Sequence, residues 1–129
     1  MKLKDDFYFI KQTEYTDKGV NYTVALNASH FIYAAHFPGN PVTPGACLTQ
    51  MAKELTEELI QAPLFLKVVK NIKFTQVINP LLYPEVNFAL VVAQENEHVF
   101  KINVGVACGN ETFAKLSLLL NLLSKNKSG

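Results

Sequence analysis

The sequence predicts one α+β domain in which a single long helix packs against an antiparallel sheet. Strand-like runs fill residues 7–28 and the part of the chain after residue 63, and only the segment between them has a long helical pattern. The chain has 129 residues, of which 49% are hydrophobic, so it can bury one core. No repeat or linker divides it. We therefore expect one domain over residues 1–129, with a frayed tail over 124–129.

The first two elements are predicted to form a β-hairpin. The runs FYFIKQTEYT (7–16) and VNYTVALNA (20–28) are rich in β-branched and aromatic residues. The turn-forming sequence Asp17-Lys18-Gly19 separates them, which is typical of a hairpin. The next residues, SHFIYAA (29–35), are apolar and aromatic without clear alternation and lead into a proline-rich stretch.

The long amphipathic helix is predicted to start after Thr43, which can serve as its N-cap, with Pro44 at the first helical position. It continues through ACLTQMAKELTEELIQA (46–62), and Pro63 ends it. The apolar face carries Leu48, Met51, Ala52, Leu55, Leu59 and Ala62. The polar face, which such helices usually turn to solvent, carries Thr49, Gln50, Lys53, Glu54, Glu57 and Glu58.

The rest of the chain returns to strand-like sequence. Turn signals at NPLLYP (79–84), near Asn96-Glu97 and at Gly109-Asn110 divide it into runs of alternating or β-branched residues. These runs predict three or four strands. The last apolar run, LSLLLNLL (116–123), fits a strand or a helix, because periodicity alone does not separate the two.

Composition excludes several classes of protein. The net charge is +1 and all twelve basic residues are lysine, which argues against nucleic-acid binding. The N-terminus lacks the apolar run of a signal peptide, and no segment approaches the ~18 apolar residues of a membrane span. We therefore expect a cytoplasmic protein away from the membrane. Cys47 and Cys108 lack metal-ligand spacing, so we expect free thiols, with Cys47 packed in the first helical turn, and no metal site.

The stretch HFPGNPVTPG (36–45) combines a histidine with a stiff backbone. Pro38, Pro41 and Pro44 fix φ, while Gly39 and Gly45 permit conformations or close approaches that a Cβ would block. Just beyond, the start of the helix presents free N–H groups near Gly45 and Ala46.

A base that works near neutral pH and donors for a developing oxyanion together suit acyl chemistry. Removal of a proton next to a carbonyl needs a base and stabilisation of the resulting enolate oxygen. The competing interpretation is that His36 is an ordinary loop histidine and that the prolines and glycines only punctuate the chain before a helix.

The motif closely resembles the signature of the FabZ/FabA dehydratases, which act on 3-hydroxyacyl groups carried by acyl carrier protein. In that family a His-Phe-Pro-Gly-x-Pro-x-x-Pro-Gly run precedes the central helix. The matching residues are His36, Phe37, Pro38, Gly39, Pro41, Pro44 and Gly45. The later stretch KNIKFTQVINP, with Phe74 and Pro80, is also similar. The resemblance implies a hotdog fold, a long helix wrapped by an antiparallel sheet, which pairs with a second copy.

The resemblance also implies roles for individual residues. His36 is expected to take the C2 proton of a (3R)-3-hydroxyacyl thioester, while the N–H of Gly45 holds the thioester oxygen. Phe37 and the prolines and glycines of the motif would shape the loop. Family dehydratases have Glu or Asp six residues after the position of Pro44, supplied by the partner subunit, and this acid protonates the departing hydroxyl.

The sequence departs from the family at this acid, because the position holds Gln50. A carboxamide is not a useful proton donor. Glu54 lies one helical turn further on the same stripe and is the candidate replacement, acting directly or through a water that Gln50 positions. Three outcomes stay open: Glu54 is the acid, His36 suffices with water, or the protein binds acyl groups without catalysis.

We expect a dehydratase that converts (3R)-3-hydroxyacyl thioesters into trans-2-enoyl thioesters, in fatty-acid or polyene-type biosynthesis. It needs no cofactor or metal and forms a homodimer or a higher homo-oligomer. The expected substrate carrier is acyl carrier protein, an acidic protein that Lys67, Lys70 and Lys73 would attract, although lysines also guard exposed strand edges. The alternatives are a non-catalytic acyl-binding or assembly subunit and a hotdog thioesterase.

Overall fold

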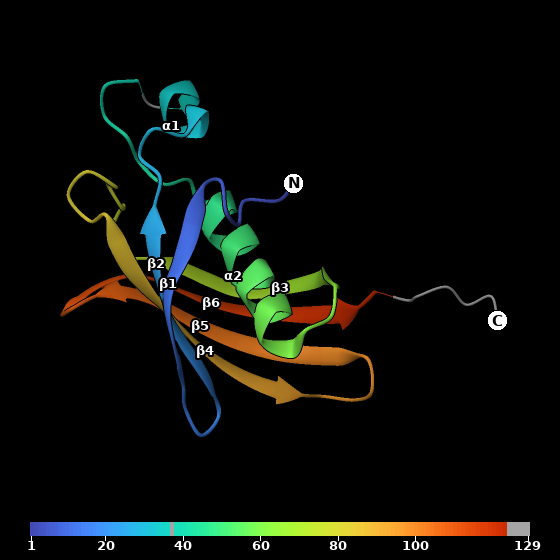
Figure 1. Cartoon of the computed structure of the whole chain (residues 1–129). Coiled ribbons are helices and arrows are strands. Elements are labelled where there is room, and N and C mark those ends of the chain that lie inside the picture. Colours follow the sequence, from blue (N-terminus) through green and yellow to red (C-terminus); the bar gives the residue numbers. More distant parts are fainter. Residues whose placement is uncertain (37, 124–129) are drawn as a thin grey trace.

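The protein consists of a six-stranded antiparallel sheet and two helices (Figure 1). The computed structural model describes residues 1–36 and 38–123. The predicted frayed tail and Phe37 of the motif therefore lie outside the described residues. The strands are β1 (Tyr8–Tyr15), β2 (Gly19–Leu26), β3 (Leu64–Phe74), β4 (Glu85–Gln94), β5 (Val99–Cys108) and β6 (Glu111–Leu122), and the helices are α1 (Phe31–His36) and α2 (Gly45–Ile60).

The sheet has the strand order β1-β2-β4-β5-β6-β3, and every neighbouring pair is antiparallel. Helix α2 lies along one face of this sheet (Figure 1). The order puts β3 at an edge, beside the last strand of the chain rather than beside the strand that follows it. This is the predicted α+β architecture, and the long helix against a curved antiparallel sheet is the hotdog arrangement.

The core fills the space between α2 and the sheet. Along β2 every second side chain is buried, from Val20 to Leu26, as expected for a strand with one face on the core. From the helix, Met51 and Leu55 are fully buried against these strands. The apolar face predicted for the helix is therefore confirmed over its central turns.

The predicted start of α2 is wrong by one residue. Helix α2 begins at Gly45, and Pro44 occupies the N-cap position without a side-chain cap. The hydroxyl of Thr43 hydrogen-bonds to the hydroxyl of Tyr33, at 2.9 Å, and does not cap the helix. At the other end the helix stops at Ile60, where Gln61 adopts a left-handed conformation.

Two further segments are a helix that the sequence pattern does not predict and a strand whose type that pattern leaves open. Residues 31–36 form the short helix α1, for which no element was predicted. The run LSLLLNLL belongs to β6 up to Leu122, which decides between strand and helix. Within the described part of the chain, no helix is long and apolar enough to cross a membrane.

Candidate active site

His36 is the last residue of α1 and is exposed to solvent. Figure 1 shows α1 at the end of the molecule where α2 begins. The sequence places His36 in a stiff loop, whereas the structure places it on a helix that immediately precedes that loop. Its position therefore depends on what holds α1.

His30 anchors the start of α1. Its Nε2 lies 3.0 Å from Asp6 Oδ2, and its Nδ1 accepts the N–H of Ile32 at 3.1 Å. These two contacts assign the proton to Nε2, so the ring is a neutral imidazole that donates to the carboxylate. The buried ring also contacts Phe7 edge-on, at 5.2 Å, and stacks on Phe31, at 4.7 Å. The histidine thereby ties α1 to the segment that precedes β1.

Tyr33 forms the second anchor. Its ring stacks on Phe7 with centroids 5.0 Å apart, and its hydroxyl shares a 2.9 Å hydrogen bond with Thr43. Burial raises the pKa of Tyr33 to about 12, so the hydroxyl stays protonated at neutral pH. Because Thr43 lies two residues before α2, this bond fixes α1 relative to the start of the long helix.

The loop between the two helices contains the remaining motif residues. Gly39 has φ of 81°, a left-handed conformation that favours glycine over other residues. Pro38 and Gly39 are exposed, while Pro41 and Pro44 are partly buried. The loop-shaping role of these four residues is compatible with their positions, and for Phe37 it stays a prediction.

The start of α2 offers two free backbone donors. The first amides to bond are those of Cys47 and Leu48, which both donate to the carbonyl of Pro44, at 3.0 and 3.2 Å. The N–H groups of Gly45 and Ala46 come before them and find no acceptor among residues 1–36 and 38–123. Free N–H groups at the positive end of a helix suit an anionic oxygen.

An apolar hollow of about 270 Å³ adjoins these donors. Gly45 and Leu48 line it from α2, and Phe74 and Ile78 line it from β3 and the loop that follows. A Cβ at Gly45 would lie only 2.6 Å from the tip of the Phe74 ring, so a larger residue here would displace that ring from the start of the helix. The later stretch that resembles the dehydratase family thus meets the motif in space.

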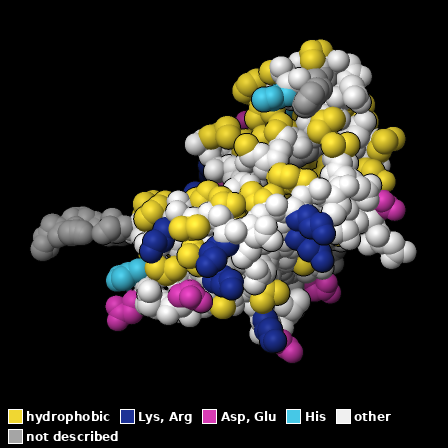
Figure 2. Space-filling model, turned by 180° about the vertical axis from the view of Figure 1, so that it is seen from behind, with side chains coloured by type: hydrophobic (Ala, Val, Ile, Leu, Met, Phe, Trp, Pro, Cys, Tyr) yellow, Lys and Arg dark blue, Asp and Glu magenta, His cyan; other side chains and the backbone are white. Residues whose placement is uncertain are grey.

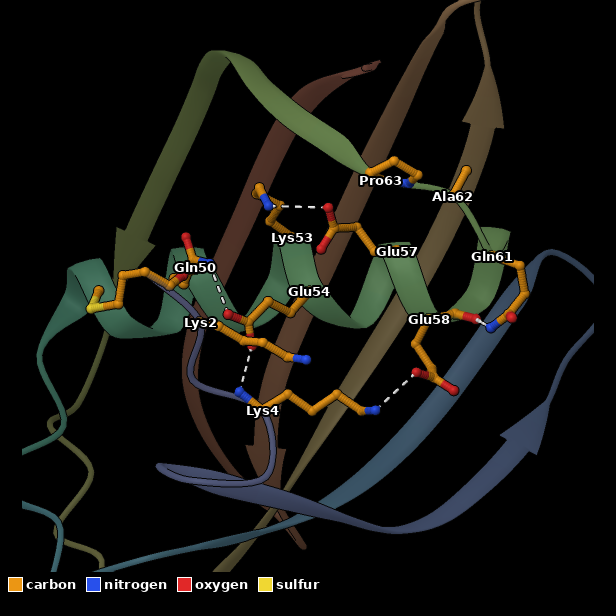
Figure 3. A pocket seen from close by; sticks show the side chains of 11 residues that line it. Lys2, Lys4, Gln50, Lys53, Glu54, Glu57, Glu58, Gln61, Ala62 and Pro63 are labelled. Atoms are coloured by element: carbon orange, nitrogen blue, oxygen red, sulfur yellow. Dashed lines mark hydrogen bonds and ion pairs between the residues drawn. The ribbon is translucent and has the colours of Figure 1, made fainter. Parts of the chain in front are cut away.

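Gln50 and Glu54 lie side by side on α2, beneath the N-terminal segment (Figure 3). Gln50 Nε2 donates to Glu54 Oε2 at 2.8 Å. The Glu54 carboxylate also accepts the backbone N–H groups of Leu3 and Lys4, at 2.7 and 2.8 Å, and the hydroxyl of Tyr8, at 3.0 Å. All four partners are donors, which suits an ionised carboxylate that accepts hydrogen bonds.

The prediction that Glu54 lies on a solvated polar face is wrong, because Glu54 is only 5% exposed. The N-terminal residues cover it, and Leu3 enters the core beside it. Burial, and next the negative charge of Glu54, raise the pKa of Tyr8 well above its ordinary value, so that hydroxyl remains a donor.

The single chain brings only some of the predicted site residues together. The motif, the Gly45 and Ala46 amides and the hollow share one end of α2. No hydrogen bond or ion pair in the described parts of the chain joins His36 to Gln50 or Glu54. Among these residues there is also no group of three His, Cys, Asp or Glu side chains placed to hold a metal ion.

The anchors of α1 were missed in the sequence. His30, Asp6 and Tyr33 carry no spacing signal, because their contacts join segments that are up to 24 residues apart. The surroundings of Glu54 were missed for the same reason, since the nearest donors lie about 50 residues before it.

Several solved structures share the fold at low sequence identity. The dehydratase heterocomplex ApeI:P from Xenorhabdus doucetiae aligns with a TM-score of 0.65 and 15% identity, over 88% of this chain and 96% of that one. A hypothetical thioesterase from Streptococcus pneumoniae, solved with coenzyme A, aligns with a TM-score of 0.63 and 10% identity, over 93% and 88% of the two chains. A protein from Erwinia carotovora subsp. atroseptica aligns with a TM-score of 0.62 and 18% identity, over 89% and 94%.

These identities show a shared hotdog fold and nothing finer, and both dehydratases and thioesterases use it. No curated protein sequence matches the chain. Residues 11–115 match the ApeI-like family, described as ApeI dehydratase. This range includes α1, α2, the whole His36 motif and β3, and so most of the domain. The chain therefore belongs to the ApeI-like dehydratase family.

Proposed function

We propose that the protein dehydrates (3R)-3-hydroxyacyl thioesters, with His36 as the base. The observation that carries this proposal is the pair of free amides at Gly45 and Ala46 next to the histidine motif, the first of which adjoins an apolar hollow. Membership of a dehydratase family gives the same reaction class. The histidine supplies the base, the amides supply the oxyanion donors, and the hollow suits an acyl chain.

The reaction proceeds through an enolate. His36 takes the proton from C2 of the thioester, and the electron pair moves onto the carbonyl oxygen, which the N–H of Gly45 holds. The C2=C3 double bond then forms as the C3–O bond breaks. The imidazolium of His36 returns its proton to the departing oxygen, so that water leaves and the histidine is neutral again.

This scheme assigns the proton return to His36 rather than to Glu54. Each Glu54 contact is a donor, so no contact takes a proton from it or positions an acid O–H towards a substrate. The role of Glu54 as a replacement acid remains the competing hypothesis, and the Glu54→Gln variant tests it.

We also propose that the chain works as a dimer through β3. The strand is an edge of the sheet, and on the face that carries α2 it exposes Leu66, Val69 and Phe74. Pairing of β3 with a second β3 would cover these side chains and bring a second α2 alongside the first. A related hotdog chain, as in the Xenorhabdus heterocomplex, is the other partner that such an edge can take.

Acyl carrier protein is the proposed carrier of the substrate. Lys67, Lys70 and Lys73 are exposed along β3, where an acidic carrier would be attracted. Figure 2 shows lysine side chains among hydrophobic ones on the side away from α2, with acidic side chains between and beside them.

The test is hydration of a trans-2-enoyl-acyl carrier protein, the reverse reaction, by wild type, His36→Ala and Glu54→Gln. We expect His36→Ala to lose ~10²–10⁴-fold in rate, the usual contribution of a general base. His98→Ala is the matched control, because His98 is exposed on a distant turn. A loss in Glu54→Gln as large as that in His36→Ala, with intact folding, would assign the acid to Glu54, because a lost general acid costs ~10²–10⁴-fold in rate.

Product analysis distinguishes the other functions. A 3-hydroxyacyl thioester that yields an enoyl thioester identifies a dehydratase, whereas release of the free acid identifies a thioesterase, the activity named for the Streptococcus structure. Saturable acyl binding without turnover would identify a binding subunit.

A further inference from the structure

Gln50 has a fixed orientation. Its Nε2 donates both to Glu54 Oε2, at 2.8 Å, and to the carbonyl of Met1, at 2.6 Å. A carboxamide nitrogen carries two N–H donors, so both are used, and these acceptors settle which end of the amide is nitrogen. The side-chain oxygen Oε1 is left as a free acceptor among the described residues, and Figure 3 shows it pointing away from Glu54.

Glu54 sets the orientation of the Gln50 amide, and the Glu54 carboxylate is itself held in one orientation. It is buried, and the N–H groups of Leu3 and Lys4 and the hydroxyl of Tyr8 hold it in place. Rotation of the Gln50 amide would point a carbonyl oxygen at this carboxylate and lose two hydrogen bonds. The arrangement therefore fixes an acceptor where the related dehydratases would have an acid.

Gln50 borders a hollow of about 440 Å³ near the oxyanion donors. Ala46, Thr49 and Lys53 line the same hollow from α2, Met1 lines it from the N-terminal segment, and Leu66 lines it from the exposed edge strand β3. The Lys53 ammonium already pairs with Glu57, at 3.1 Å. A partner at β3 would close over this hollow.

We propose that Gln50 Oε1 accepts a hydrogen bond from the 3-hydroxyl of the acyl group and that Glu54 is the residue that positions it. This inference rests on the proposed function and on the proposed β3 dimer, in which we place Gln50 of one subunit in the site of the other. An acceptor-only group favours a 3-hydroxyl, which can donate, over a saturated C3 or a 3-oxo group, which cannot. Gln50 and Glu54 would therefore select acyl groups by the oxidation state of C3, with the 3-hydroxy form preferred.

The same acceptor fits the chemistry of the leaving group. As the C3–O bond breaks, the departing oxygen keeps its own hydrogen, which remains hydrogen-bonded to Gln50 Oε1. The same oxygen receives its second hydrogen from the His36 imidazolium. No proton passes through Gln50 or Glu54. The glutamine thus orients the hydroxyl and the departing water without acting as an acid.

The test compares binding of three stable ligands, in which an amide replaces the thioester of pantetheine: (3R)-3-hydroxyhexanoyl, 3-oxohexanoyl and hexanoyl. We expect wild type to bind the hydroxy ligand about three- to ten-fold more tightly than hexanoyl, as one hydrogen bond contributes. Gln50→Leu should abolish this preference, because it removes the Oε1 acceptor, and it should weaken binding of the hydroxy ligand more than binding of hexanoyl, which makes no hydrogen bond to Oε1.

Two variants separate positioning from stability. Glu54→Gln should weaken the hydroxyl preference, because Gln50 loses its charged acceptor. Tyr8→Phe removes another hydrogen bond of Glu54 without touching Gln50, so it should lower the Tm and keep the preference. Thermal melting of each variant checks that it folds.

An unchanged hydroxyl preference in Gln50→Leu would overturn the proposal, and so would the absence of such a preference, or of measurable binding, in wild type. These outcomes differ from failure of the proposed function, which would appear as a lack of turnover of the thioester substrate while the binding preference still depended on Gln50.

Discussion

Glu54 shows how a charged residue on a helix can belong to the interior. Its carboxylate replaces the water that the amides of Leu3 and Lys4 would otherwise bind, and it fixes the segment that carries Leu3 into the core. Charge-assisted hydrogen bonds of this kind are stronger than neutral ones. The residue therefore connects the N-terminal segment, the long helix and the orientation of Gln50.

Replacing Glu54 with Ala should lower the free energy of unfolding by roughly 2–4 kcal/mol, because it leaves several buried donors without an acceptor. Urea denaturation measures the change. Glu58→Gln is the control, since it removes only the partly exposed ion pair with Lys4 and should cost less than about 1 kcal/mol. Equal losses in the two variants would contradict the anchoring role.

Cys47 should be the less reactive of the two thiols. Burial raises the pKa of the Cys47 thiol, and this outweighs the stabilisation of a thiolate expected in a first helical turn. At pH 8 the thiolate fraction is therefore reduced, and it rises only as the pH increases further. We expect iodoacetamide to label the half-buried Cys108 first, as followed by intact-protein mass spectrometry. Unfolding in urea should make the two rates similar, whereas faster native labelling of Cys47 would contradict this.

At the scale of elements, the sequence predicts those helices and strands whose formation depends on a local pattern of apolar residues. The alternation of β2 and the apolar face of α2 are visible because each follows the period of its element. The helix α1 is too short to show a period, and it forms because His30 and Tyr33 fasten it to distant segments. The start of α2 differs from the prediction by one residue, and the tertiary partner of the Thr43 hydroxyl is likewise invisible in the local pattern.

The hydrogen bond between Tyr33 and Thr43 should couple α1 to α2. Tyr33→Phe and Thr43→Val each leave a buried hydroxyl unpaired and should lower the unfolding free energy by about 1–2 kcal/mol. The double variant should lose little more than either single one, because both remove the same bond. Urea denaturation measures the stability, and kcat is expected to fall in parallel as His36 is held less firmly. Fully additive losses would show that the two hydroxyls act independently.

At the scale of the whole molecule, the sheet leaves one apolar edge. Strand β3 pairs with β6 on one side, and two irregularities in this register interrupt the pairing. Its exposed side chains lie beside the hollow that Gln50 borders. Assembly and activity are therefore expected to depend on the same edge.

Val69→Glu should convert the proposed dimer into monomers and abolish turnover, because a carboxylate would be buried in an apolar interface. Light scattering after size-exclusion chromatography measures the mass. Val91→Glu is the matched control: both valines are 44% exposed, but Val91 lies on β4, away from the β3 edge. A Val69→Glu variant that keeps the dimer would place the interface elsewhere.

The strand order also has a consequence for how the chain is made. β3 ends at residue 74, but its partner β6 begins only at residue 111, so during synthesis β3 must wait for the last strand to leave the ribosome. In that interval an apolar strand has two unpaired edges, the condition in which nascent chains aggregate. The three lysines spaced along β3 then act as gatekeepers that keep growing chains apart. The same charges that we expect to attract a carrier in the finished protein would thus protect it before it is complete.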